Sequence, residues 1–387
     1  MWHPSGIVER SRSLPGVQLE LQSHGYLLQA GAIKVAVVGG GINGVMSAWA
    51  LALKGCSVDL FERGQLMGAT SSASTKLLHG GLRYLEQGHL KLVREALHER
   101  RWWMVRAPHL AKPLQINVPV YKGSRRPGWM IWCGLTLYDW LAGQASLGYS
   151  RWCSREEVLR SCSDLRSEGL LGAFTFFDGQ MDDQALGLWA AEKATAAGVR
   201  MHTENLVEAI SPDATVQVDG QQRCYDKVVN AAGPWARQLL ETSGIEAQHH
   251  LDLIRGSHLL LDSECENAFL LQAPSDGRIC FVLPHQAKTL VGTTEVRQKL
   301  SEPICCSLEE ASYLLELYHH YFPSRNVDIC GVFSGLRPLI RSHANPNKAT
   351  REYAIEKSRD VVSVFGGKWT TARVLGLRVA EAVASQR

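Results

Sequence analysis

One short segment of the chain gathers residue types that could hold a cofactor and act on a substrate. Residues 70–88 read TSSASTKLLHGGLRYLEQG, a run of small and hydroxyl-bearing residues followed by basic and aromatic ones. Such a run offers hydroxyls and backbone amides to a flavin and its ribityl chain, and its paired glycines allow a close approach. We therefore predict a flavin cradle, with cofactor contacts from Ser71, Ser72, Thr75, Lys76, Leu77, Gly80 and Gly81.

Upstream of this segment, three glycines have the spacing of a dinucleotide-binding turn. Residues 33–38 (IKVAVV) are apolar and β-branched, as in a buried parallel strand, and Gly39, Gly41 and Gly44 follow as G-x-G-x-x-G. In such a unit the first glycine permits the tight turn, the second lets backbone approach the pyrophosphate, and the third lets helix pack on strand. The helix N-terminus then faces the phosphates. A glycine triplet alone is a weak signal, because it often marks only a turn.

The elements around the triplet favour dinucleotide binding. Residues 45–54, rich in Ala, Leu, Met and Trp, predict a helix that ends at Gly55, and residues 57–61 predict a second strand that ends at Glu62. A carboxylate at this place can accept hydrogen bonds from both ribose hydroxyls of an adenosine, which argues against a 2′-phosphorylated cofactor. The further contacts expected around this turn are Ile42, Asn43 and Arg63.

The composition limits the class of protein. The chain has 387 residues, 45% of them hydrophobic and 20% charged, which is ordinary for a soluble globular protein of one or two domains. A formal net charge of +3 without a long Lys/Arg run argues against nucleic-acid binding, whereas acidic small substrates stay open. No stretch approaches the roughly 20 apolar residues of a spanning helix, and residues 1–32 lack the apolar core of a signal peptide, so we expect a cytoplasmic location.

Two further features carry no predicted function. The ten cysteines form no C-x-x-C pair, so we expect no metal site, and most of them should be small buried hydrophobes. Residues 1–32 contain scattered Arg, Pro, Gly and Gln without periodicity. We expect either a flexible extension or a start codon placed too early.

An aromatic segment that begins at Pro127, just after two arginines, has two interpretations. One is peripheral contact with a membrane surface, where Trp and basic side chains are favoured. The other is a helix packed on the protein itself, because Trp is usually well buried. The sequence leaves both open. The residues concerned are Arg125, Arg126, Trp129, Met130, Ile131, Trp132, Tyr138 and Trp140.

The middle of the chain supplies elements that must position these residues. Residues 174–177 predict a strand, Asp178-Gly179 predicts a turn, and residues 182–197 predict a helix capped by Asp182 and Asp183. Further strands are predicted at residues 201–210, 215–218 and 225–230.

Later elements bring small residues back toward the cofactor. The last of these strands ends in NAAGPW, where Ala232 and Gly233 leave room for a ligand. Residues 251–333 are mainly strand-like with one helix at 308–321, which resembles a separate substrate sheet. A strand at 361–365, the turn GGKWTT and a final helix then form a second glycine-rich strand-to-helix connection.

These motifs together resemble the FAD-dependent glycerol-3-phosphate dehydrogenases, of the D-amino-acid-oxidase-like flavoprotein superfamily. Five segments carry the likeness: VVGGGINGVMSAWALALKG, TSSASTKLLHGGLRYLEQG, VVNAAGPWA, IRGSHLLL with DGRICFVLP and VGTTEV, and FSGLRPL with TREYAIE and VFGGKWTT. The first and third are shared across the superfamily, and the others are more restricted. Two departures are that the chain stops soon after GGKWTTAR, where longer members add a helical domain, and that the connection between Arg351 and Lys368 is short.

The resemblance implies an α/β fold (α+β overall) with a Rossmann-like FAD-binding domain and a second, mainly antiparallel β-sheet substrate domain. We expect residues 33–111, 155–240 and 330–387 to form a discontinuous FAD-binding domain, and residues 112–154 and 241–329 to form the substrate domain. Across from the cradle, the expected cofactor contacts are Gly335, Gly366, Gly367, Lys368 and Thr370.

The implied reaction oxidises sn-glycerol 3-phosphate to dihydroxyacetone phosphate and passes electrons to quinone or another acceptor. Hydride transfer to flavin needs a base for the hydroxyl proton, and His258 is the candidate, because imidazole has a suitable pKa and the family's corresponding histidine lies beside the substrate. The competing interpretation is a buried core histidine, and His79 is a second candidate. Arg337 and Lys368 complete the expected catalytic set.

A phosphate group with nearly two negative charges requires several cations, preferably arginines. The expected substrate contacts are Arg83, Tyr84, Arg255 and Arg351, with Arg337 and Lys368. Lys368 could instead stabilise negative charge on the reduced flavin. Two other functions stay open: the same flavin chemistry on another 2-hydroxy acid, phosphorylated alcohol or amine, and a non-enzymatic assembly or regulatory protein whose flavin is structural.

Overall fold

The apolar run after Ile33 forms the strand β1 (Lys34–Val38), in which Val35, Ala36 and Val37 are fully buried. A strand buried on both faces belongs at the centre of a layered α/β sheet, as the pattern predicts. The computed structural model describes residues 31–86, 88–341 and 353–385, without the side chain of Arg83. The predicted N-terminal extension, except its last two residues, lies outside this described part.

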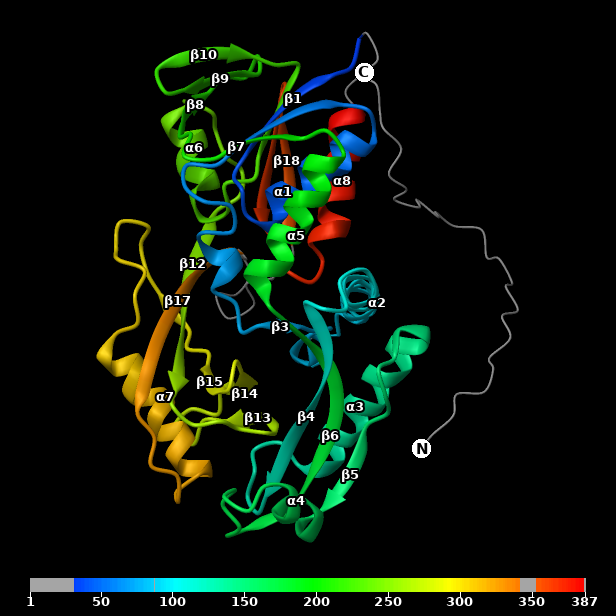
Figure 1. Ribbon diagram of the computed structural model, residues 1–387, viewed down its shortest axis with the longest axis vertical. Coiled ribbons are helices and arrows are strands. Elements are labelled where there is room, and N and C mark those ends of the chain that lie inside the picture. Colours follow the sequence, from blue (N-terminus) through cyan, green and yellow to red (C-terminus); the bar gives the residue numbers. More distant parts are fainter. Residues whose placement is uncertain (1–30, 87, 342–352, 386–387) are drawn as a thin grey trace, which may run out of the picture.

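Among the described residues, six strands form the sheet around β1 (upper half of Figure 1). Their order is β18 (Tyr353–Ser358), β19 (Val361–Gly366), β11 (Lys227–Asn230), β1, β2 (Ser57–Phe61) and β7 (Arg200–His202). All are parallel except β18. Because β2 and β11 lie on opposite sides of β1, the chain reverses its direction of travel across the sheet there. Ligands bind at such a switch point in open α/β sheets.

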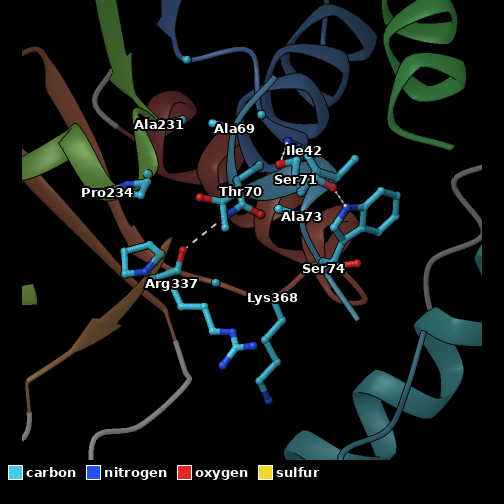
Figure 2. Close-up of a pocket in the computed structure, with 18 of the residues that line it drawn as sticks. Ile42, Ala69, Thr70, Ser71, Ala73, Ser74, Ala231, Pro234, Arg337 and Lys368 are labelled. Atoms are coloured by element: carbon cyan, nitrogen blue, oxygen red, sulfur yellow. Dashed lines mark hydrogen bonds between the residues drawn. The ribbon is translucent and has the colours of Figure 1, made fainter. Parts of the chain in front are cut away.

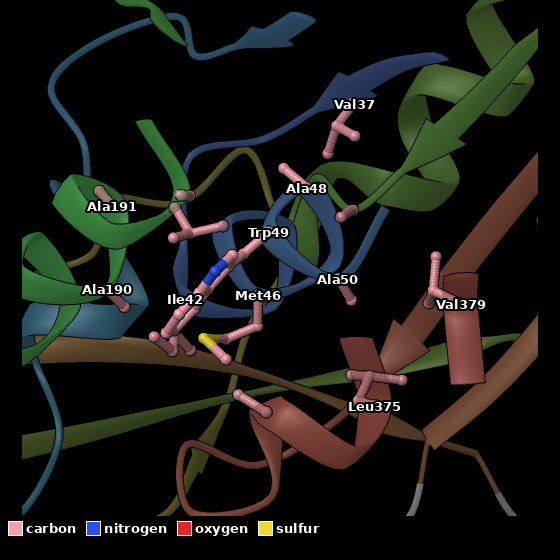
Figure 3. Close-up of a cluster of buried hydrophobic side chains, with 14 of the residues drawn as sticks. Val37, Ile42, Met46, Ala48, Trp49, Ala50, Ala190, Ala191, Leu375 and Val379 are labelled. Carbon is pink, nitrogen blue, oxygen red and sulfur yellow. The ribbon is translucent and has the colours of Figure 1, made fainter. Parts of the chain in front are cut away.

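Helices cover this sheet on both faces. The helix α1 (Ile42–Leu53) contacts both α5 (Asp183–Ala196) and α8 (Ala372–Ala384), and Figure 3 shows Met46 of α1 between Ala190 of α5 and Leu375 of α8 in this apolar layer. Each fully buried aliphatic side chain here contributes about 1.5–3 kcal/mol. The other face carries α6 (Ala236–Thr242) and a small antiparallel sheet. That sheet consists of β8 (Val207–Ile210), β9 (Thr215–Val218) and β10 (Gln221–Cys224).

The lower half of Figure 1 is a mixed sheet to which ten described strands belong. Its order is β16 (Val296–Arg297), β12 (Leu251–Leu261), β15 (Lys288–Gly292), β14 (Ile279–His285), β13 (Ala268–Gln272), β4 (Ala111–Tyr121), β6 (Leu170–Met181) and β3 (Leu77–Leu78). In addition, β17 (Ile329–Ile340) pairs with β12, and β5 (Arg151–Ser154) pairs with β6.

Alternate residues of the mixed sheet enter two different cores. Leu271 packs with the helix α7 (Leu308–Tyr321) on one face, and Leu270 packs with α3 (Gly128–Ala142) on the other. The remaining helices are α2 (Leu90–Arg106) and α4 (Arg155–Ser161), with short 3-10 turns η1 (Thr70–Ser72), η2 (Leu82–Tyr84), η3 (Gly143–Ala145) and η4 (Gly233–Trp235).

Two local predictions are wrong, and long-range pairing explains both. The predicted turn at Asp178-Gly179 is part of β6, because β4 pairs with both residues and β3 pairs with Gly179 from the other side. The strand predicted at residues 201–210 is divided between β7 and β8, which belong to different sheets. Asp182 caps α5 as predicted, since its side chain accepts the Ala185 N–H at 3.0 Å, but Asp183 forms an ion pair with Lys76 instead.

Strand pairing also bears on the domain boundaries. β6 pairs with β4, and β17 pairs with β12, so both strands lie in the mixed sheet although the predicted FAD-binding segments include them. We therefore propose that residues 155–182 and 329–340 belong with the substrate domain, and the other predicted boundaries stay as they were.

Candidate functional site

A cavity of about 550 Å³ lies at the switch point and extends between the two large sheets. Its walls include the residues that follow β1, β2, β11 and β19, together with side chains from β13, β14 and β17. This volume is within the range of about 300–1,000 Å³ that is usual for cofactor and small-molecule sites.

The glycine turn brings backbone to the cavity wall. Gly39 has a φ of +109°, and a Cβ there would lie 2.5 Å from the Ala231 carbonyl oxygen, so only glycine fits the turn. Gly44 has no room for a Cβ against the backbone of Gly39, and it packs α1 on β1 without lining the cavity. Gly41, Ile42 and Asn43 do line the cavity at the start of α1, which favours a bound phosphate.

The end of β2 forms the expected ribose and adenine side. The Glu62 carboxylate lines the cavity and accepts backbone N–H groups of Gly40 at 2.6 Å and Gly64 at 2.9 Å. These bonds hold an acceptor at the place where ribose hydroxyls are expected. Nearby, the Arg63 guanidinium carbon lies 3.8 Å from the Trp235 ring centroid. Ala232 and Gly233 line the same end.

The predicted cradle crosses the middle of the cavity (Figure 2). The Ser71 hydroxyl accepts the Ile42 N–H at 3.0 Å, and the Trp369 indole N–H donates to the Ser71 carbonyl at 2.9 Å. The first glycine turn, the cradle and the second glycine turn are therefore held together. The predicted contacts that line this part are Ser71, Thr75, Leu77, Gly81, Gly366, Gly367, Lys368 and Thr370.

Four other predicted cofactor contacts support the cradle from behind instead of lining the cavity. Lys76 is buried, with its Nζ 2.6 Å from Asp183 and 2.8 Å from the Ser72 carbonyl. The Ser72 hydroxyl donates to Ala69. A Cβ on Gly335 would lie 2.8 Å from the Ala73 carbonyl, so this glycine allows β17 to approach the cradle. Gly80 packs under Tyr138.

Two cations and a phenol meet at the other end of the cavity. Arg337 and Lys368 both line it, and Figure 2 shows their side chains extending in the same direction. The Arg337 guanidinium donates to the Thr293 hydroxyl at 2.8 Å, and the Lys368 Nζ lies 3.6 Å from the Tyr84 ring centroid. This end can therefore bind an anionic group.

The other predicted substrate arginines are placed differently. Arg255 forms an ion pair with Glu310 at 2.8 Å and donates to Gln298 at 2.8 Å, so its side chain belongs to a network with α7 and does not line the cavity. Arg351 lies outside the described residues. The backbone of Arg83 is in η2, and its side chain lies outside the described part.

The predicted base, His258, is fully buried behind the cavity wall. Its Nε2 lies 3.0 Å from the hydroxyl of Thr75, which does line the cavity, and its ring stacks on Phe333 at 4.7 Å. Burial, and then the charges of Arg337 and Lys76, lower the pKa of His258 well below its ordinary value, so the ring is neutral. His79, the second candidate, lines the cavity directly.

Sequence reasoning missed several residues of the wall. Trp235, Thr293 and Trp369 stand inside the motifs NAAGPW, VGTTEV and GGKWTT, so the motifs themselves held a signal for them. Asp178 also lines the cavity, but the sequence Asp178-Gly179 is typical of a turn and gave no sign of a site residue. Leu270, Ile279 and Phe281 have only the alternation of ordinary strands, and their role follows from sheet packing.

A dinucleotide turn at a switch point, a carboxylate after the second strand and a second sheet that closes the cavity define a class: flavin-dependent oxidoreductases of two domains. Comparison with known families gives the same result, since the family described as DAO, FAD dependent oxidoreductase, matches residues 34–382. The chain belongs to this family, whose cofactor is FAD. The glycine turns, Glu62 and the cradle are residues that fit this cofactor.

Within this family, the chain is similar to several glycerol-3-phosphate dehydrogenases. A glycerol-3-phosphate dehydrogenase of Pseudomonas aeruginosa is 38% identical over 363 residues, which cover 88% of this chain and 69% of the relative. The mitochondrial glycerol-3-phosphate dehydrogenase of Homo sapiens is 33% identical, and this chain covers 51% of it. The structure of the glycerol-3-phosphate dehydrogenase from Bacillus halodurans complexed with FAD has a TM-score of 0.73 at 26% identity, covering 92% of this chain and 65% of that one. The resemblance seen in the motifs is confirmed.

Proposed function

We propose that this chain oxidises sn-glycerol 3-phosphate to dihydroxyacetone phosphate. The observation that carries the proposal is that Arg337 and Lys368 both line one end of a cavity whose other end has the features of a dinucleotide site. A phosphomonoester is close to a dianion at neutral pH, and the two positive charges of Arg337 and Lys368 match that charge, with the Tyr84 ring beside Lys368. FAD, when bound, supplies the hydride acceptor for the alcohol carbon.

The chain's own residues would orient the substrate and accept its hydroxyl proton. Thr293 holds the Arg337 guanidinium, which fixes the direction of the anion. We propose that the proton passes through the Thr75 hydroxyl to His258, since the two side chains are 3.0 Å apart and only Thr75 reaches the cavity. A bound phosphate would offset the Arg337 charge that disfavours a protonated His258. His79 is the alternative acceptor.

The test is anaerobic addition of glycerol 3-phosphate to the FAD-loaded protein. Bleaching of the flavin absorbance supports the proposal. A panel of 2-hydroxy acids, phosphorylated alcohols and amines, followed by dye reduction, distinguishes the alternative that the enzyme has another substrate. Reduction by none of these compounds, with FAD still tightly bound, would favour a structural flavin.

We also propose that α3 makes peripheral contact with the cytoplasmic face of a membrane. None of the described helices is long and apolar enough to span a bilayer. Three tryptophans of α3 lie on one exposed face, with exposed fractions of 67% for Trp129, 58% for Trp132 and 74% for Trp140. Indole rings favour the interfacial region of bilayers. Tyr138, by contrast, is buried, so that face of the helix packs on the protein. The membrane interpretation is proposed only for the tryptophan face.

The two arginines before α3 bind the protein itself. Arg126 pairs with Glu86 at 2.6 Å, and Arg125 donates to the Asp276 carbonyl at 2.6 Å. The tryptophans therefore carry this proposal. We propose a lipid-dissolved quinone as the electron acceptor, because membrane contact would place the protein at the bilayer in which such a quinone dissolves. Reduction of a short-chain quinone by glycerol 3-phosphate in the presence of vesicles tests that acceptor.

Sedimentation with phosphatidylglycerol vesicles tests the contact. The triple variant Trp129→Ser, Trp132→Ser, Trp140→Ser should lose vesicle binding. The control Leu308→Ser, which removes another exposed apolar side chain (84%) from α7, should keep it. Equal binding of both variants would contradict the proposal.

A further inference from the structure

A buried polar group joins α3 to the segment between β3 and α2, here called the substrate loop (residues 79–84). The Tyr138 hydroxyl accepts the N–H of Gly80 at 2.8 Å and donates to the Asp178 carboxylate, whose oxygens lie 2.8 and 2.9 Å away. The Arg100 guanidinium donates to the same carboxylate at 2.8 Å. Tyr138 and Arg100 are 1% exposed and Asp178 is 3% exposed.

The surroundings of the Tyr138 oxygen fit a protonated hydroxyl between Gly80 and Asp178. A Cβ on Gly80 would lie 2.7 Å from the Tyr138 oxygen, so the glycine allows this close approach, where the sequence suggested an approach to flavin. Burial and the Asp178 charge raise the pKa of Tyr138 well above its ordinary value, so the hydroxyl keeps the proton that it donates. Arg100 also donates to the carbonyls of Phe177 and Ala145, which fixes its position.

The substrate loop presents one apolar and two polar or aromatic side chains to the cavity. His79 and Tyr84 lie on either side of Gly80 and line the cavity, as Leu82 does, and the Lys368 Nζ lies over the Tyr84 ring. The His79 N–H also donates a hydrogen bond, to the Thr370 hydroxyl at 3.3 Å. The shorter Tyr138 bond links the loop to the protein interior at Gly80.

We propose that Tyr138, held by Asp178 and Arg100, is a positioning residue that fixes the substrate loop for binding of the anionic substrate. The inference rests on the proposed function for the identity of that substrate. The loop, its hydrogen bond to Tyr138 and the Lys368 Nζ over the Tyr84 ring are features of this chain whatever the substrate is.

The test is Tyr138→Phe in the FAD-loaded protein, because this change removes one oxygen and keeps the ring. Gly80 and Asp178 each lose a partner, which in a buried site costs at least about fivefold in an equilibrium. We expect KM for glycerol 3-phosphate to rise by at least about that factor with a smaller change in kcat and unchanged FAD content. Amide exchange of peptides that contain residues 79–84 should become faster by a similar factor.

The matched control is Tyr121→Phe. Tyr121 is also buried and donates its hydroxyl proton to a backbone carbonyl, that of Arg166, at 2.9 Å, but it does not line the cavity. It should leave both KM and exchange at residues 79–84 unchanged. If Tyr138→Phe behaves like this control, Tyr138 only fills the core and the inference is overturned.

Two further measurements keep the result decisive. If the protein oxidises no glycerol 3-phosphate, the two variants can still be compared by calorimetric binding of inorganic phosphate and by amide exchange of residues 79–84. A failure of the proposed function can then be told apart from a failure of the inference about Tyr138. If Tyr138→Phe does not fold, exchange in the wild-type protein decides. Slow exchange of the Gly80 amide, comparable to β6, supports the inference, and exchange at the rate of a free loop overturns it.

Discussion

The Nζ of Lys76 lies 2.6 Å from a carboxylate oxygen of Asp183, at a point where 11% of the lysine side chain and none of the aspartate side chain is exposed. The pair joins the flavin cradle to the start of α5. Asp183 also accepts the backbone N–H and the hydroxyl of Ser74, at 3.0 and 2.7 Å. Lys76, which the sequence predicts as a cofactor contact, thus holds the cradle segment in place.

Removing the charge of Lys76 should therefore destabilise the protein as a whole. Lys76→Met leaves Asp183 as an uncompensated buried charge, which costs about 3–5 kcal/mol. We expect a lower thermal midpoint and easier loss of FAD, measured by thermal unfolding and flavin fluorescence. The control Arg151→Met breaks an exposed pair with Glu157 at 3.4 Å and should cost at most about 1 kcal/mol. Equal effects would refute the structural role of Lys76.

The third glycine of the turn provides a test of the dinucleotide site. Gly44→Ala would place a Cβ against the backbone of Gly39, so α1 must move away from β1. We expect poor FAD retention and a lower yield of folded protein, measured by the absorbance ratio of flavin to protein. Gly134→Ala is the matched control, because this helical position is open and alanine should stabilise α3 by about 0.5–1 kcal/mol.

Substrate charge recognition should depend on Arg337. Arg337→Gln removes a cation and its hydrogen bond to Thr293, so the glycerol 3-phosphate concentration needed for half-maximal rate should rise at least several-fold. FAD content should change little. Arg297→Gln, which removes an exposed arginine paired with Asp252, is the control. Equal loss of substrate and cofactor binding in Arg337→Gln would contradict the assignment.

The two histidines can be separated by rate measurements. If His258 accepts the proton through Thr75, then His258→Gln and Thr75→Val should both lower kcat by about 10²-fold or more while FAD stays bound. His79→Gln should then affect mainly KM, because this side chain would be only a neighbour of the substrate. The reverse pattern, with kcat lost in His79→Gln alone, would assign the base to His79.

Burial of His258 also predicts how stability depends on pH. The pKa of His258 is lowered in the folded protein, so below about pH 6.5 the unfolded chain binds more protons at this residue than the folded chain. The protein therefore becomes less stable as the pH decreases. The slope from this group approaches about 1.4 kcal/mol per pH unit until the folded pKa is reached. Between pH 7 and 5, unfolding by urea should show a smaller loss of stability for His258→Gln than for wild type. An identical loss would mean that His258 is accessible or already paired.

The sequence by itself determined the features that depend on neighbours along the chain. The order β1, glycine turn, α1, β2 and Glu62 is contained in residues 34–62, where strand and helix periods and the need for glycine act locally. The helix predicted at residues 308–321 has these bounds in the structure, where Ser307 and Glu310 form a capping box at its start. The cradle, too, was visible as a run of small and hydroxyl residues.

Only the tertiary structure decided which chemical groups reach the cavity. Arg255, Lys76 and His258 lie in motifs that suggested direct contact, yet distant partners determine their positions: Glu310 binds the arginine and Asp183 binds the lysine. His258 is enclosed by strands β15 and β17, which pair with β12 on its two sides. Asp178 is a strand residue because β4, which is distant in the sequence, pairs with β6 at this position. Spacing along a chain fixes local conformation, whereas burial and ion pairing depend on segments that meet only after the sheets have formed.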